Sequence, residues 1–189
     1  RLMEQHSQRI IMGIDPGNYI LGYGVILVDN KRAHYIDMGV INLKSVKDHF
    51  SKLNIIFNKV SELISQYKPD HLAIEAPFYG KNPQVMLKLG RAQGAAIAAA
   101  IKHDMQVYEY APRKVKMAIT GNGAASKEQV SAMLSRTLDV VLNPEYLDAT
   151  DAIAIALCHY YQLTNPLADI SNSTSWKKFL EAHPEKIKN

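Results

Sequence analysis

The segment Ile10–Ile41, IIMGIDPGNYILGYGVILVDNKRAHYIDMGVI, decides the fold of this chain. It contains runs rich in apolar and β-branched residues, which are typical of strands. The strands are expected at residues 10–15, 19–28 and 33–41. Turn-forming residues separate them, Asp15-Pro16-Gly17-Asn18 and Asp29-Asn30-Lys31. Because connections this short join antiparallel neighbours, the segment predicts an antiparallel sheet of three strands.

Downstream of this segment, helical and strand patterns alternate. Apolar residues recur every three or four positions from Val46 through Phe50 to Tyr67, which predicts a helix that Pro69 ends. Further strands are expected at residues 71–75 and 105–110, and further helices from residues 82, 112, 126 and 148. The order predicts an α/β protein with an RNase H-like fold. Its five-stranded mixed sheet has three antiparallel and then two parallel strands, flanked by helices.

The composition is that of an ordinary globular protein, and 189 residues suffice for one well-buried domain. A net charge of +4 leans mildly toward an anionic partner. Cys158 is the single cysteine, so an internal disulfide is excluded and a reducing compartment is favoured. The longest apolar stretch, residues 92–101, is too short to span a bilayer. We therefore expect a cytoplasmic protein with no membrane partner.

Four acidic residues mark the ends of predicted elements. Asp15 and Glu75 close strands, whereas Asp148 and Asp151 open the last long helix. Each has an ordinary structural interpretation: a turn former, a solvated strand end, or acids that cap a helix and complement its dipole. If the four converge, their charges require a neutralising cation. Oxygen-only ligands suit Mg²⁺ or Mn²⁺, and a phosphate substrate would follow.

Several motifs, in order along the chain, together resemble the RuvC family of Holliday-junction resolvases. They are Gly13-Ile14-Asp15-Pro16-Gly17, Gly22-Tyr23-Gly24-Val25, Ala73-Ile74-Glu75, Leu87-Lys88-Leu89-Gly90-Arg91-Ala92-Gln93-Gly94, Glu109-Tyr110-Ala111-Pro112-Arg113-Lys114-Val115-Lys116, Gly121 to Gln129 and Asp148-Ala149-Thr150-Asp151-Ala152. The resemblance covers residues 9–162, and such collinear agreement is far more specific than one motif alone.

The resemblance implies an activity and a set of ligands. Family members resolve four-way DNA junctions in recombination and repair by symmetric, metal-dependent hydrolysis that leaves 5′-phosphate, religatable nicks. Asp15, Glu75, Asp148 and Asp151 match the acids that hold metal in this family. We expect two Mg²⁺ ions per active site, with Mn²⁺ able to substitute. Asp15 is expected to bridge the two ions, because it comes from the central strand.

The resemblance also indicates residues that bind DNA. Lys116 and Lys127 match family positions associated with DNA binding and catalysis, and Phe78 matches an aromatic residue in a loop beside the site. Lys81 and Arg113 are further candidates for contacts with the DNA backbone. For a lysine considered without the family, a solvated surface position is the ordinary interpretation.

The helix expected from residue 82 suggests a homodimer. Gly90, Gly94 and Ala98 recur every four residues and would let another backbone approach closely, and Ala95, Ala96, Ala99 and Ala100 would broaden this strip. The alternative is that part of the strip packs on the chain's own sheet. Two-fold symmetry suits a four-way junction. By resemblance, a RuvA–RuvB-like branch-migration complex is a further partner.

We expect residues 10–163 to form the RNase H-like nuclease domain and residues 164–189 a polar C-terminal tail. Residues 1–9 would be an N-terminal extension or a remnant of expression. Other functions stay open at this point. Another RNase H-like nuclease, cutting RNA–DNA hybrids or pre-tRNA, would use the same pocket chemistry. An actin-like nucleotide-binding module shares the Asp-x-Gly motif but needs a longer chain, and a non-catalytic junction binder would not need a complete acid set.

Overall fold

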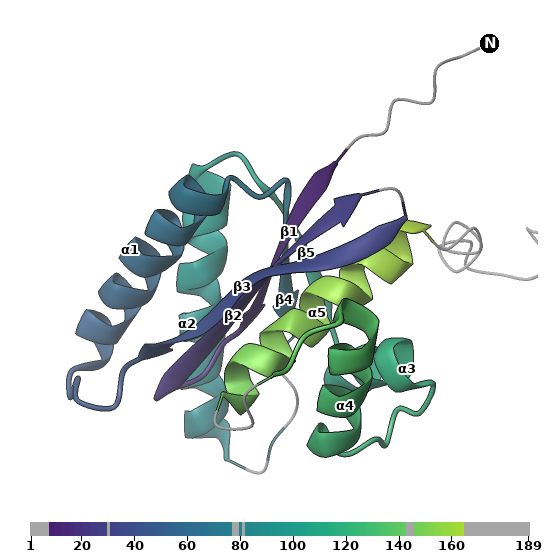
Figure 1. Ribbon diagram of the computed structural model, residues 1–189. Coiled ribbons are helices and arrows are strands. Elements are labelled where there is room, and N and C mark those ends of the chain that lie inside the picture. The colour runs from purple at the N-terminus through teal and green to yellow at the C-terminus, as the bar shows by residue number, and fades with distance from the viewer. Residues whose placement is uncertain (1–7, 30, 77–79, 81, 143–145, 165–189) are drawn as a thin grey trace, which may run out of the picture.

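The computed structural model describes residues 8–29, 31–76, 80, 82–142 and 146–164. Its centre is a sheet of five strands in the order β3-β2-β1-β4-β5 (Figure 1). The strands are β1 (Arg9–Asp15), β2 (Ile20–Asp29), β3 (Arg32–Asn42), β4 (His71–Glu75) and β5 (Gln106–Tyr110). β1 pairs with β2 and β2 with β3 antiparallel, whereas β4 runs parallel to both β1 and β5. This arrangement confirms the predicted RNase H-like sheet.

Helices cover both faces of the sheet. They are α1 (His49–Tyr67), α2 (Pro83–Lys102), α3 (Pro112–Thr120), α4 (Lys127–Leu138) and α5 (Leu147–Thr164). Figure 1 shows α1 and α2 on one face and α5, with α3 and α4 beside it, on the other. Each face has its own apolar core, in which Met12 and Ile14 pack toward α1 and α2 while Ile11 packs toward α5. The alternation of side chains along β1 feeds both cores.

The helix boundaries follow from local chemistry. Asn82 caps α2 by accepting backbone hydrogen bonds from Gln84 and Val85. Ser126 and Gln129 form the predicted capping box at the start of α4. Gly121 ends α3 in the left-handed conformation, with φ of 74°, which glycine adopts without strain.

Glycines let α5 lie directly on the sheet. A Cβ added to Gly13 of β1 would come within 1.9 Å of the carbonyl oxygen of Ala152. A Cβ added to Gly22 of β2 would come within 2.0 Å of the carbonyl oxygen of Asp148. The two strands therefore admit α5 at backbone distance only because these positions carry no side chain. This contact brings the first turns of α5 against the end of β1.

Some expectations need correction. α1 begins at His49, so Val46 lies outside it, and Phe50 is 73% exposed rather than part of the buried stripe. Ala96, Ala99 and Ala100 are buried in the core and do not broaden an open strip on α2. α5 begins at Leu147, which places Asp148 inside its first turn. Within the described residues, no helix combines the length and apolar character needed to cross a bilayer.

Candidate active site

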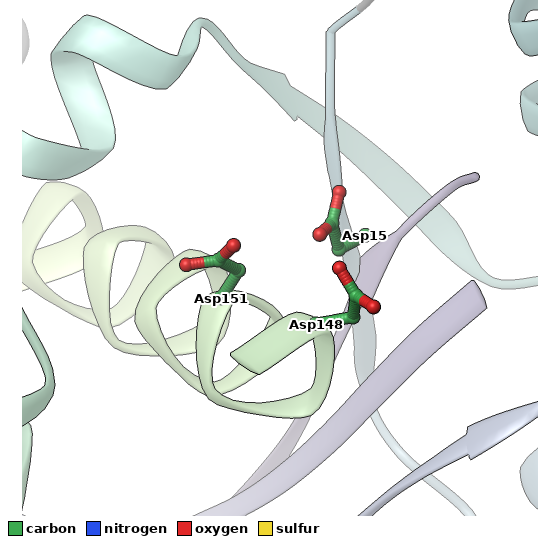
Figure 2. A group of neighbouring side chains, drawn as sticks. All are labelled: Asp15, Asp148 and Asp151. Carbon is green, nitrogen blue, oxygen red and sulfur yellow. The ribbon is translucent and has the colours of Figure 1, made fainter. Parts of the chain in front are cut away.

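The strand ends and the start of α5 bring acidic side chains together. Asp15 and Glu75 are the last residues of β1 and β4, which run parallel and pair up to Ile14 and Ile74. Carboxylate oxygens of Asp15, Asp148 and Asp151 all lie within 4.8 Å of one another. Figure 2 shows Asp15 on its strand facing the two aspartates of α5. Glu75 is not a member of this tight group of three.

The electrostatics of the group centre on Asp15. Burial, followed by the charges of Glu75, Asp151 and Asp148, raises the pKa of Asp15 to about 8. Burial and the charge of Asp151 also raise the pKa of Glu75. These carboxyl groups are therefore poorly tolerated as free anions, and a cation among them would restore their ionised form.

Among the described residues, Lys127 is the basic side chain that contacts the acids directly. Its ammonium donates a hydrogen bond of 2.6 Å to Asp151. Burial works against its charge, but the bond and the charges of Asp151, Asp15 and Asp148 prevail and raise the pKa of Lys127. Lys116 stands further off, and its charge lowers the pKa of Glu75 against the effect of burial.

One cavity of about 730 Å³ gathers the predicted site residues. All the predicted acids line it, together with Arg113, Lys116 and Lys127. The remaining wall is largely apolar and includes Leu89, Pro112, Val115, Val130 and Ile155. Phe78 and Lys81, which were also predicted to bind DNA, lie outside the described residues. The cavity thus combines a negatively charged centre with a basic margin, as a site for a cation and a phosphate requires.

The donor set fits hard divalent cations. Its ligand atoms are carboxylate oxygens, without sulfur or imidazole, which suits Mg²⁺ or Mn²⁺ rather than zinc. Burial, together with the charges of Glu75, Asp151 and Asp148, raises the pKa of Asp15 even though Lys127 acts in the opposite direction. A divalent ion held by Asp15, Asp148 and Asp151 would supply further positive charge.

Sequence reasoning assigned no role to Gln93, although this residue stands in one of the motifs shared with the family. Gln93 of α2 is buried, lines the cavity and donates hydrogen bonds to the backbone oxygen of Glu75 and to the carboxylate of Glu109. The signal that could have found it is a polar residue on the buried face of an alanine-rich helix. Its partners belong to two other elements, which the sequence pattern does not connect to it.

Comparisons with known proteins all point to the same family. The family model of crossover junction endodeoxyribonuclease RuvC matches residues 11–159. The RuvC of Christiangramia forsetii is 51% identical over 183 residues, which cover 96% of this chain and 94% of that protein. The RuvC of Bacteroides fragilis is 50% identical over 189 residues, 99% of this chain and 100% of that protein.

Solved structures give the same result. The structure of Thermus thermophilus RuvC in complex with Holliday junction substrate superimposes with a TM-score of 0.76 at 31% identity. The match covers 82% of this chain and 94% of that one. A second Thermus thermophilus RuvC structure gives a TM-score of 0.72 at 32% identity, over 80% of this chain and 94% of that one. The chain belongs to the crossover junction endodeoxyribonuclease RuvC family.

Proposed function

We propose that this chain is a structure-specific endonuclease that resolves four-way DNA junctions in recombination and repair. It would cut two strands symmetrically by metal-dependent hydrolysis and leave 5′-phosphate, religatable nicks. Family membership supports the substrate. The observation that carries the mechanism is the convergence of Asp15, Asp148 and Asp151 within 4.8 Å in a cavity with a basic margin.

Asp15, Glu75, Asp148 and Asp151 would hold two Mg²⁺ ions, with Mn²⁺ able to substitute. When bound, the ions would activate a water for attack and stabilise the charge that develops on the leaving oxygen. Asp15 is the best candidate for a ligand shared by both ions. Its carboxylate lies within 4.8 Å of those of Asp148 and Asp151, and its strand is the parallel neighbour of the strand that ends in Glu75. Glu75 would complete the ligand set from the neighbouring strand.

The basic margin of the cavity would hold the DNA backbone. Lys127 stands beside Asp151 at the N-terminus of α4, where an ammonium and helix N–H groups can bind one phosphate together. Lys116 and Arg113 line the same cavity and would contact flanking phosphates. We retain Phe78 and Lys81 as further DNA-contacting candidates on the family match alone.

A homodimer is part of this proposal. A Cβ added to Gly90 or Gly94 would meet no atom within 4 Å, so both positions face open space. Leu87 and Ile101, on the same face of α2, are 58% and 61% exposed. The strip is therefore open and partly apolar, as an interface between two copies requires. Two sites related by two-fold symmetry could cut a four-way junction symmetrically.

The proposal also includes a partner complex, a location and the extent of the nuclease domain. A RuvA–RuvB-like branch-migration complex would deliver the junction, and the cytoplasm is the expected location. Residues 10–163 would suffice for the nuclease, with residues 164–189 as a tail. The alternative of a nuclease for RNA–DNA hybrids keeps the same pocket chemistry, but the family match favours junction DNA.

Cleavage of a mobile four-way junction with 5′-labelled strands tests the proposal. Paired cuts at symmetric positions, sealed afterwards by ligase, are expected with Mg²⁺ and not with a chelator. Asp15→Asn should bind the junction and fail to cut it. The same reactions with duplex DNA and an RNA–DNA hybrid test the substrate. Faster cutting of the hybrid, or near wild-type cutting by Asp15→Asn, would count against the proposal.

A further inference from the structure

Gln93 is the one polar residue among the buried residues of α2, the others being Ala92, Ala96, Ala99 and Ala100. It is only 6% exposed. A buried amide on an otherwise apolar helix face destabilises the fold unless its hydrogen bonds are satisfied, and an apolar residue could pack there without that requirement. The presence of a glutamine at this position is therefore explained by its hydrogen-bonding partners rather than by packing.

Those partners fix the amide of Gln93. Its nitrogen donates to the backbone oxygen of Glu75 at 3.2 Å and to the carboxylate of Glu109 at 3.0 Å. Because a carbonyl oxygen and a carboxylate only accept, the nitrogen and not the oxygen of the amide must face them. Each of the two amide hydrogens then serves one partner, one at the end of β4 and one on β5.

The bond to Glu75 lies where β4 has lost its pairing with β1 and pairs only with β5, through Glu75 and Tyr110. The pairing of β1 with β4 ends at Ile14 and Ile74, one residue before the acids. On the other side, the N–H of Ala76 donates to the carbonyl of Tyr110 at 3.0 Å. Gln93 adds a donor for the carbonyl of Glu75 itself. Hydrogen bonds from β5 and from α2 therefore fix the backbone at Glu75.

Glu75 is the acid that needs such support. Asp15, Asp148 and Asp151 are held close to one another by the direct contact of α5 with β1, whereas Glu75 stands outside that group. The position of Glu75 therefore depends on the backbone at the end of β4, which Gln93 contacts.

We propose that Gln93 is a positioning residue for Glu75, holding it at the distance at which it serves as a metal ligand. This inference rests on the proposed function, in which Glu75 is a ligand. Removal of partners that orient metal ligands typically weakens metal affinity 10- to 100-fold. The loss of Gln93 should therefore weaken metal binding by about 10-fold or more, before any DNA is present.

An exchange of the two side chains separates positioning from packing. In the double variant Gln93→Glu/Glu109→Gln, the amide at position 109 donates to the carboxylate at position 93, so the bond between α2 and β5 persists. The carbonyl of Glu75, however, loses its donor. In the single variant Glu109→Gln, Gln93 keeps that donor, which makes this variant the matched control. Gln93→Leu, of similar volume and without polar atoms, provides a second test.

The measurements are the Mn²⁺ dissociation constant by electron paramagnetic resonance without DNA, thermal unfolding in chelator, and junction cleavage as a function of Mg²⁺ concentration. We expect the double variant to unfold cooperatively and to bind Mn²⁺ about 10-fold more weakly than Glu109→Gln. Its cleavage should recover as Mg²⁺ is raised, and Gln93→Leu should behave likewise.

Equal Mn²⁺ affinity in wild type, Gln93→Leu and the double variant would overturn the inference. So would a cleavage defect that high Mg²⁺ does not relieve in either variant. The proposed function has a separate test, since a wild-type protein that does not cut the junction contradicts it whatever the Mn²⁺ affinities of the variants.

Discussion

The ammonium of Lys127, at the first residue of α4, lies 2.6 Å from a carboxylate oxygen of Asp151 on α5. An exposed ion pair of this kind adds little stability, typically below about 1 kcal/mol. The ion pair matters for the active site instead. The ammonium is bound to one of the carboxylates that a divalent ion would bind. Lys127 and the ion therefore compete for Asp151, and an ammonium freed by the ion is left close to the bound phosphate.

Lys127→Gln should separate these two effects. We expect cleavage at saturating Mg²⁺ to fall by about 100-fold, the usual loss when a donor to a developing charge is removed. Mn²⁺ affinity without DNA should be unchanged or several-fold higher, because the competitor is gone. Single-turnover cleavage and a Mn²⁺ titration measure the two quantities. Lys114→Gln, which removes an equal charge from an exposed position over the ring of Tyr110, is the control. Weaker Mn²⁺ binding by Lys127→Gln would contradict the competition.

A second prediction concerns the contact that brings α5 to β1. Gly13→Ala places a methyl group 1.9 Å from the carbonyl oxygen of Ala152, so helix and strand must separate. We expect a loss of about 1–3 kcal/mol in the free energy of unfolding, the usual result of overpacking. Mn²⁺ affinity should fall with it, because Asp148 and Asp151 move away from Asp15. Urea unfolding and a Mn²⁺ titration provide the measurements.

The control for this change is Gly94→Ala, which enters open space on α2. It should leave stability unchanged or raise it by up to about 1 kcal/mol, since alanine favours a helix more than glycine does. If both substitutions lowered the free energy of unfolding equally, the loss in Gly13→Ala could not be attributed to the close contact between β1 and α5.

The fold and the meeting of the acids could be predicted because both depend on local patterns. Asp15 and Glu75 close apolar runs, and parallel neighbouring strands bring their carboxyl ends to one edge of the sheet. The exposure of Phe50 could not be predicted from the sequence. The spacing of apolar residues shows which face of α1 is apolar, but not whether the sheet extends far enough to cover the first turn of the helix. The capping box at Ser126 was visible in the sequence, but the bond from Lys127 to Asp151 joins residues that only the fold brings together.

A third prediction concerns association through α2. Gly94→Leu adds a side chain where the chain itself offers no contact within 4 Å, so each copy should fold normally. The added volume would block a second copy, and we expect a monomer by sedimentation at micromolar concentration. Junction cleavage should then yield single nicks rather than paired cuts. Ala132→Leu, an exposed position on α4, makes the same kind of change elsewhere and should leave the dimer intact. Gly94→Leu sedimenting as a wild-type dimer would refute this interface.

The last prediction is a pH dependence of stability that arises far from the acids. His159 of α5 is 1% exposed, with ring nitrogens 2.9 Å from His71 and 2.7 Å from the hydroxyl of Tyr110, and the ring of Tyr108 lies against it. Burial, with smaller contributions from the charges of His71 and Arg9, lowers the pKa of His159 from 6.5 to about 4.

At His159, the folded protein therefore binds fewer protons than the unfolded chain between pH 4 and 6.5. The contribution of His159 to the free energy of unfolding is complete above pH 6.5 and is lost as the pH falls to about 4, by about 3 kcal/mol. Urea unfolding in chelator from pH 4.5 to 7.5 measures it. The raised pKa of Asp15 gives a slope of opposite sign over the same range, so the contribution of His159 is the difference in slope between wild type and His159→Gln. His34→Gln, at an exposed position, should keep the wild-type slope. A wild-type slope in His159→Gln would assign the effect to other groups, because a glutamine in the same place binds no proton.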